Sequence, residues 1–170
     1  MITYKLLRIR EGRLFPLYVE HEREMIIGEW LEAGIGELVD ETHVKGRGGP
    51  LSLRPGFHST LIPFTDWIGK RGSDGRLYQR LDTVWCECEV DGKEQIVTEK
   101  NGLRILPSDW YFYKTNNRQK DPWIISNRIK LNRILSHAEV EQICRKHGVE
   151  AQKIETTVTR ESDGCPVTPY

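Results

Sequence analysis

Thr83-Val-Trp-Cys-Glu-Cys-Glu-Val90 is the stretch that decides the fold, because small apolar side chains alternate in it with larger or charged ones. Successive side chains of a β-strand point to opposite faces of a sheet, so this pattern predicts a half-buried strand. One face carries Val84, Cys86, Cys88 and Val90, and the other carries Trp85, Glu87 and Glu89. Asp91-Gly92 follows directly and is a strong hairpin signal, which predicts that Glu94–Thr98 returns antiparallel.

Further strands are predicted on both sides of this one. Ile2–Arg10 is rich in β-formers, the turn Glu11-Gly12-Arg13 follows it, and Leu14–Val19 returns as a second strand. Because Pro16 cannot donate to a hydrogen-bond ladder, we expect that second strand at an edge or a bulge. Trp110–Tyr113 and Trp123–Leu135 are also predicted strands, and Trp123, Ile125, Ile129 and Leu131 are expected on one face.

One helix is predicted after the strands. Ser136 and Glu139 form the capping box Ser-x-x-Glu, and Gly148 is placed to end the helix. An apolar stripe at helical spacing consists of Val140, Ile143, Cys144 and His147. Shorter helices are expected at Glu29–Ala33 and Phe64–Lys70. The predicted class is therefore α+β, with a curved, mainly antiparallel sheet, one C-terminal helix and one or two short helices.

Composition bounds the class of protein. The chain has 170 residues, and its 25 Lys and Arg balance 25 Asp and Glu, so the formal net charge is zero. This length suits one domain, placed at residues 1–159, with a loose tail over 160–170. The neutral balance makes nucleic acid an unfavoured partner. Four cysteines do not make a disulfide framework, and no apolar run reaches the ~18 residues of a membrane span, so we expect a cytoplasmic protein with no membrane partner.

Arg54-Pro-Gly-Phe-His-Ser-Thr60 is the segment most suggestive of function. Pro55-Gly56 predicts a type II turn, because proline presets one dihedral angle and glycine allows the positive one. The turn would hold Arg54 on one side and His58 with two hydroxyls on the other, which suits an anionic or nucleotide-like ligand. In the alternative, the turn only redirects the chain and His58 caps a carbonyl. Gly34–Pro50 precedes this segment and is expected to be a mobile surface loop.

A resemblance connects this segment with others. Tyr4–Arg8, Gly28–Ala33, Leu53–His58, Val84–Val90 and Trp123–Leu135 look like a family of short, uncharacterised proteins of phages and prophage-bearing bacteria. Its most specific element is the Arg-Pro-Gly-aromatic-His motif. The resemblance implies a mobile-element origin. Together with the Arg54–Thr60 segment, it leads to the prediction of a phage-type accessory protein that binds a small anionic or nucleotide-like ligand or a host protein. The predicted ligand-binding residues are Tyr4, Arg54, His58 and Thr60.

A second similarity concerns the ADP-ribosyltransferases. Their arginine-class members use an arginine on an early strand, an aromatic-x-Ser-Thr-Ser strand and a later Glu-x-Glu. This chain carries Arg8, then Phe57-His-Ser-Thr60 with Leu61 in place of the last serine, and then Glu87-x-Glu89. The similarity implies an enzyme acting on a nicotinamide dinucleotide (NAD) as substrate, without a resident cofactor. Its catalytic residues would be Arg8, Ser59, Glu87 and Glu89.

Two other patterns, one of cysteines with a histidine and one of aromatic with basic residues, each have a functional and a simpler interpretation. Cys86-x-Cys88 and Cys144-x-x-His147 supply the four soft ligands of a structural zinc, but we predict that they pack in the core, helix against strand, without metal. Trp110–Tyr113 is followed by Lys114, Arg118 and Lys120, a mixture that can stack bases and hold phosphates. Its alternative is a strand whose aromatic side chains are alternately buried.

Overall fold

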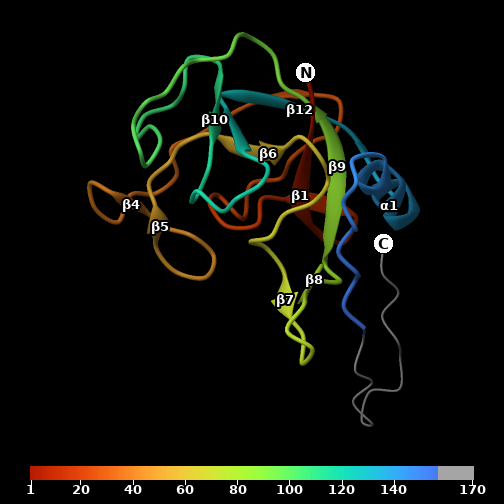
Figure 1. Ribbon diagram of the computed structural model, residues 1–170. Coiled ribbons are helices and arrows are strands. Elements are labelled where there is room, and N and C mark those ends of the chain that lie inside the picture. The colour runs from red at the N-terminus through yellow and green to blue at the C-terminus, as the bar shows by residue number, and fades with distance from the viewer. Residues whose placement is uncertain (157–170) are drawn as a thin grey trace.

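The computed structural model describes residues 1–156 (Figure 1). The predicted tail over 160–170 and the last three residues of the predicted domain, 157–159, lie outside the described residues. Within residues 1–156, no helix has the length and apolar character needed to cross a bilayer.

A mainly antiparallel sheet dominates the fold, and the predicted α+β class is confirmed. The main sheet has eight strands in the order β10-β11-β6-β1-β9-β12-β3, and β2 pairs with β1 outside this path. Its strands are β1 (Ile2–Arg10), β2 (Arg13–Phe15), β3 (Trp30–Glu32), β6 (Phe57–Thr60), β9 (Thr83–Glu89), β10 (Trp110–Tyr113), β11 (Trp123–Ser126) and β12 (Arg128–Ile134). Two small hairpins consist of β4 (His43–Val44) with β5 (Leu51–Ser52), and β7 (Lys70–Arg71) with β8 (Leu77–Tyr78).

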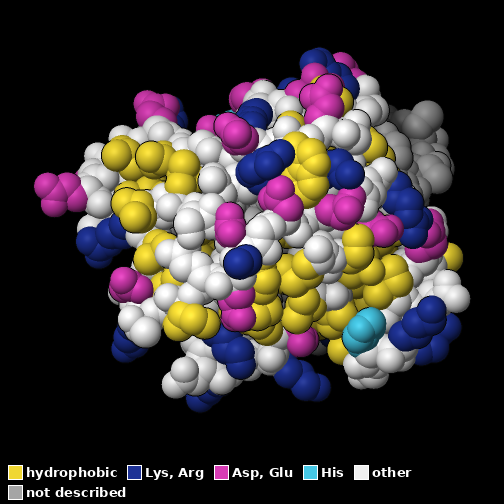
Figure 2. Space-filling model, turned by 90° about the horizontal axis from the view of Figure 1, so that it is seen from above, with side chains coloured by type: hydrophobic (Ala, Val, Ile, Leu, Met, Phe, Trp, Pro, Cys, Tyr) yellow, Lys and Arg dark blue, Asp and Glu magenta, His cyan; other side chains and the backbone are white. Residues whose placement is uncertain are grey.

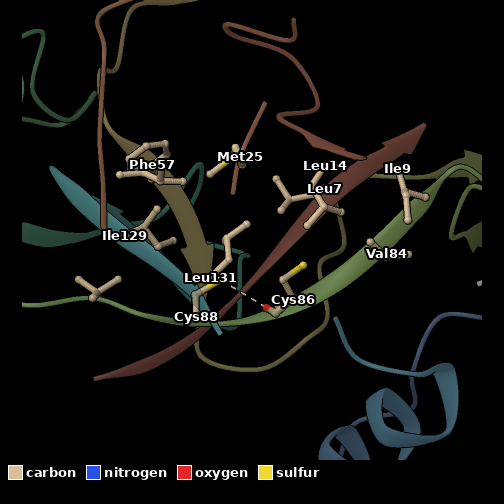
Figure 3. Packing of buried hydrophobic residues seen from close by; sticks show 12 residues of the cluster. Leu7, Ile9, Leu14, Met25, Phe57, Val84, Cys86, Cys88, Ile129 and Leu131 are labelled. Carbon is tan, nitrogen blue, oxygen red and sulfur yellow. Dashed lines mark hydrogen bonds between the residues drawn. The ribbon is translucent and has the colours of Figure 1, made fainter. Parts of the chain in front are cut away.

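β9 lies between β1 and β12, and the alternation of its side chains is confirmed. Its register with β1 runs from Ile2 opposite Glu89 to Arg8 opposite Thr83. One face supplies a core cluster that also receives residues from β1, β2, β6 and β12; Figure 3 shows this cluster on one side of β9 and the helix on the other. The cluster consists of Leu7, Ile9, Leu14, Met25, Leu31, Phe57, Val84, Cys86, Cys88, Val90, Ile129 and Leu131.

The helix α1 (His137–Lys146) covers the opposite face of β9. Its capping box is confirmed, because the Ser136 side chain accepts from the Glu139 N–H while the Glu139 carboxylate accepts from the Ser136 N–H. Gly148 follows the helix with a φ of +69°, as the predicted helix end requires. Val140 and Cys144 of α1 pack with Trp85, Leu6 and Leu135 in a second cluster. His147 of the predicted apolar stripe is exposed.

Two hairpins were predicted, and one is confirmed. β1 and β2 pair across Glu11 and Gly12, which both have positive φ angles. The prediction of a hairpin after Asp91-Gly92 is wrong, because β1 and β12 already occupy both edges of β9 and leave no edge for Glu94–Thr98. Glu94 instead makes an isolated bridge with Trp110, and the Lys93 N–H donates to the Asp109 carboxylate.

The predicted short helices are wrong, and the predicted curvature of the sheet is not pronounced. Glu29–Ala33 contributes the edge strand β3, because Leu31 enters the core opposite Ile129. In Phe64–Lys70 the Thr65 hydroxyl accepts from the Trp67 N–H, but the chain turns without forming a helix. Within residues 1–156, α1 is the one helix. The sheet is not strongly curved, and a register shift between Leu131 and Arg133 is the irregularity found in its pairing.

Two other segments differ from their predictions. Trp123–Leu135 forms two strands, and the chain bends between them at Asn127. Ile125 therefore packs with Tyr111 and Tyr113 of β10, whereas Ile129 and Leu131 lie in the large core cluster, so the predicted single face is wrong. The loop 34–50 contains β4, whose Val44 is buried.

The packing of Trp85 against α1 generates a first prediction. Trp85 is 2% exposed, whereas Trp67 is 46% exposed. We expect Trp85→Ala to lower the free energy of unfolding by about 3–5 kcal/mol, because it leaves a cavity between β9 and the helix. Trp67→Ala serves as the matched control and should cost less than about 1 kcal/mol. Urea denaturation followed by circular dichroism measures both, and equal losses would contradict the described packing.

Candidate functional site

One edge of β1 carries a gap in the sheet. β6 and β2 both pair with this edge, but β6 meets it at Tyr4 opposite Thr60 and β2 meets it from Arg8 opposite Phe15 onward. Between these points, Lys5–Leu7 have no strand partner on that edge within the described part of the chain. β2 ends at Phe15, and the next residue is Pro16, whose φ is locked near about −65°, far from the ~−140° of an antiparallel strand.

A cavity of about 530 Å³ opens at this gap. Its volume lies in the range of small-molecule sites, ~300–1,000 Å³. Its lining includes six aromatic side chains, namely Tyr4, Tyr18, Phe57, Trp67, Trp85 and Trp123. The cationic side chains of Lys5 and Arg54 and the imidazole of His58 line it as well. The Glu20 carboxylate also lines it and pairs with the Arg23 guanidinium at 3.4 Å. The cavity therefore combines apolar, stacking surfaces with cationic groups.

His58 lies on β6 and faces this cavity as a neutral imidazole. Burial, together with the positive charges of Lys5 and Arg54, lowers the pKa of His58 to about 3. Its Nδ1 is 3.3 Å from the Gly56 carbonyl oxygen, which can only accept, so Nδ1 carries the proton and Nε2 is left as an acceptor. The ring meets that of Trp123 edge-on, at 5.9 Å between centroids. His58 thus caps a carbonyl, as the simpler interpretation expected, and also lines the cavity.

Lys5 is a cavity residue that the sequence prediction missed. Its Nζ donates to the His58 carbonyl oxygen over 2.7 Å and so links β1 to β6 where the two strands separate. Burial lowers the pKa of Lys5 to about 8. The available signal was its position, because Lys5 shares the strand face of Leu7 and Ile9, which are buried in the core. A cation on the buried face of a strand needs a partner or a function.

Arg54 enters the same cavity from the segment before β6. Its Nε donates to the Asn101 carbonyl oxygen over 2.9 Å, and its guanidinium lies 4.0 Å from the centre of the Tyr113 ring. These contacts fix the side chain, while Arg54 still lines the cavity. The structure therefore brings Arg54 and His58 to one recess. Gly56 between them has a φ of +131°, which is positive as expected. The predicted type II turn is wrong, because the third residue of such a turn has a φ of about +80° and no backbone hydrogen bond in the described part of the chain closes a turn here.

The two remaining predicted ligand-binding residues differ in their roles. Tyr4 lines the cavity, and burial raises the pKa of its hydroxyl. The Thr60 hydroxyl is 2.5 Å from the Ile62 carbonyl oxygen and 3.2 Å from that of Tyr4, so it holds the end of β6 in place. Thr60 is also buried, which leaves it to support the site from behind.

The four residues of the ADP-ribosyltransferase pattern are not brought together. Tyr4 pairs with Thr60, so the neighbouring Ser59 points to the opposite face of the sheet, where it is buried. Arg8 lies opposite Thr83, and six residues of β1 at about 3.3 Å each separate it from the position opposite Glu89.

The charged residues of that pattern also have partners of their own. Arg8 donates to the His21 carbonyl oxygen over 2.9 Å and approaches the Glu22 carboxylate at 3.9 Å. Glu87 pairs with Arg133 at 3.0 Å, and Glu89 pairs with Lys130 at 2.9 Å. Both glutamates therefore belong to a solvated strand face that crosses from β9 to β12.

The three cysteines within residues 1–156 lie in two separate clusters. Cys86 and Cys88 are buried in the large core, whereas Cys144 packs under α1 with its Sγ 3.5 Å from the Pro63 carbonyl oxygen. Burial raises the pKa of Cys86 to about 12 and that of Cys144 to about 11. The expected packing of these strand cysteines against the helix is wrong, because Trp85 faces it instead. Within residues 1–156 no three His, Cys, Asp or Glu side chains are grouped to hold a metal ion.

The aromatic segment before Lys114 is largely structural. Tyr111 and Tyr113 are buried in β10, and Phe112 between them is 38% exposed and meets Trp110 edge-on. Figure 2 shows one face of the molecule, on which cationic and anionic side chains are interspersed among hydrophobic ones. That face therefore lacks the continuous basic surface that phosphate backbones require.

No family model, curated protein or solved structure matches the chain. Function is therefore inferred from the geometry of this cavity.

The close packing behind Gly56 generates a second prediction. A Cβ on Gly56 would lie 2.5 Å from Ile125 Cγ2, at a φ that side chains rarely adopt. We expect Gly56→Ala to lower the free energy of unfolding by about 2–4 kcal/mol. Gly48→Ala is the matched control, because a Cβ there would meet nothing within 4 Å, and it should be nearly neutral. Denaturant unfolding compares the two, and a neutral Gly56→Ala would mean that this glycine is not constrained as described.

The buried imidazole generates a third prediction, on stability against pH. The folded chain binds a proton at His58 only near its pKa of about 3, whereas the unfolded chain does so near 6.5. The unfolded state therefore binds more protons between these values, and stability falls with decreasing pH across that window, by up to about 1.4 kcal/mol per pH unit.

We expect His58→Gln to remove this contribution, measured as the difference in unfolding free energy from the unmodified chain between pH 6.5 and pH 4. His147→Gln at the exposed end of α1 is the control and should keep the slope of the unmodified chain. A His58→Gln variant with the full slope would show that this imidazole is not held neutral.

Proposed function

We propose that the chain is a binding module whose cavity, between β1, β2 and β6, takes a small anionic ligand with an aromatic part. The observation that carries this proposal is that Lys5, Arg54 and His58 line one cavity together with six aromatic side chains. Cations in a partly desolvated recess attract an anion more strongly than surface cations do. Aromatic walls add stacking for a planar group. An accessory role of the kind predicted from the resemblance to phage and prophage proteins is compatible with binding without catalysis.

The enzymatic alternative receives less support. Transfer of an ADP-ribosyl group would need Arg8, Ser59 and a glutamate around one bound dinucleotide. Ser59 is buried on the opposite sheet face, and Glu87 and Glu89 are paired with cations of β12. We therefore expect a dinucleotide such as NAD to bind without being cleaved, and liquid chromatography of NAD incubated with the protein checks this.

Binding of ADP, NAD and pyrophosphate measured by titration calorimetry provides the fourth prediction. Lys5→Met and Arg54→Met should each weaken the binding of ADP by about 10- to 100-fold, because each removes a charge-assisted contact. Lys45→Met is the matched control, because Lys45 lies on the exposed segment before β5 and pairs with Glu37, and its affinity should not change. Absence of heat with all three compounds would overturn the proposed function.

The same titrations should depend on pH in a defined direction. Only the protonated Lys5 ammonium attracts an anion, and its pKa in the free protein is about 8. The affinity for ADP should therefore begin to fall as the pH rises through about 8. An ordinary lysine, with a pKa near 10.5, would not lose affinity until much higher pH. An affinity that stays constant between pH 7 and pH 9.5 would show that Lys5 does not contact the ligand.

A further inference from the structure

The backbone of Leu6 points into the gap. The hydrogen bonds from Ile9 N–H to Asp82 and from Val90 N–H to Met1 lie at the two ends of the β1–β9 pairing. Because backbone direction alternates along an antiparallel strand, the odd-numbered residues of β1 direct their N–H and C=O groups toward β9. Leu6 therefore directs both groups toward the other edge, where neither β2 nor β6 pairs with it.

The carbonyl that would have met Leu6 is already engaged. Continuing the register from Tyr4 opposite Thr60 would place His58 opposite Leu6. The His58 carbonyl instead accepts from Lys5 Nζ over 2.7 Å, so the side chain of Lys5 replaces the backbone donor of Leu6. The gap thus leaves one strand N–H and one strand C=O without a strand partner, beside a cavity that Leu6 lines. Backbone groups removed from water without a partner are costly, so this pair favours a ligand that supplies one.

The size of the gap limits what can pair there. Tyr4 and Arg8, the next residues that face this edge, are already paired with Thr60 and Phe15. An added peptide strand needs several consecutive free residues, and here one residue is free. A planar group with a single donor next to a single acceptor fits instead. The Watson–Crick edge of adenine has this arrangement, with an amino donor beside a ring-nitrogen acceptor.

We infer that the cavity binds an adenine nucleotide, whose base edge pairs with the N–H and C=O of Leu6 while its phosphate faces the cations. This inference rests on the proposed function and names the ligand class. The amino group donates to the Leu6 carbonyl, and the ring nitrogen accepts from the Leu6 N–H. Tyr4 and Trp123 line the cavity and are only partly buried, so aromatic surface is available in it for the base. Lys5 and Arg54 are the cations for the phosphate.

Amide hydrogen exchange of the free protein, followed by NMR, tests the first step without any ligand. Leu6 should exchange at least tenfold faster than Lys5 and Leu7, its neighbours, because their N–H groups are bonded to β9. These neighbours are the internal control for opening of the whole strand. Protection of Leu6 equal to theirs would overturn the inference, since its N–H would already have a partner.

Titration with AMP and with purine riboside monophosphate tests the pairing itself. The second compound lacks the amino donor and keeps the ring and the phosphate, so we expect it to bind about tenfold more weakly. AMP should also shift the Leu6 amide resonance downfield and slow its exchange.

The failures of the two proposals are distinguishable. Equal affinity for the two compounds, lost in Lys5→Met and without any effect on the Leu6 amide, would overturn the base pairing and leave the anion site standing. No binding of either compound, nor of ADP, NAD or pyrophosphate, would overturn both.

Discussion

The pairing of β1 with β9 is the constraint on which the rest of the structure depends. Their register runs from Ile2 opposite Glu89 to Arg8 opposite Thr83, and each face of this pair supplies one of the two main hydrophobic clusters. With β9 on one edge, β1 has one edge left, and two strands share it. Since β2 and β6 approach from opposite ends, the length of β1 and the arrest of β2 at Pro16 together determine the gap.

Burial of nitrogen-bearing side chains at the gap has an energetic cost that the fold tolerates. The ammonium of Lys5 is stabilised by the His58 carbonyl, yet its pKa still falls to about 8, so desolvation outweighs this hydrogen bond. The His58 imidazole avoids the cost by staying neutral. Continuing the β1–β6 ladder with an apolar residue in place of Lys5 would have closed the sheet with less electrostatic strain. Sites that depart from the most stable local arrangement are where function is expected.

Local signals in the sequence predicted local structure well. The alternation in residues 83–90, the Ser136–Glu139 capping box and the Glu11-Gly12 turn each involve neighbours in the chain, and each gave the observed element. Asp91-Gly92 failed because the partner of a strand is decided by which edges are free, and that depends on β1 and β12, which are distant in sequence. Trp30–Glu32 became an edge strand for the same reason, since β12 had an edge to offer.

Part of the candidate site was predictable from the sequence, because some of its residues are close together in the chain and others are not. Arg54 and His58 flank a bend, so their common recess followed from the short range of a Pro-Gly bend. Lys5 lies fifty-three positions from His58, and only the splaying of two strands brings its amine to that carbonyl. The same reasoning explains why Arg8, Ser59 and Glu89 stay apart although they occur in a suggestive order. Order along the chain does not fix which face of a sheet a side chain occupies, whereas one register pair, Tyr4 with Thr60, does.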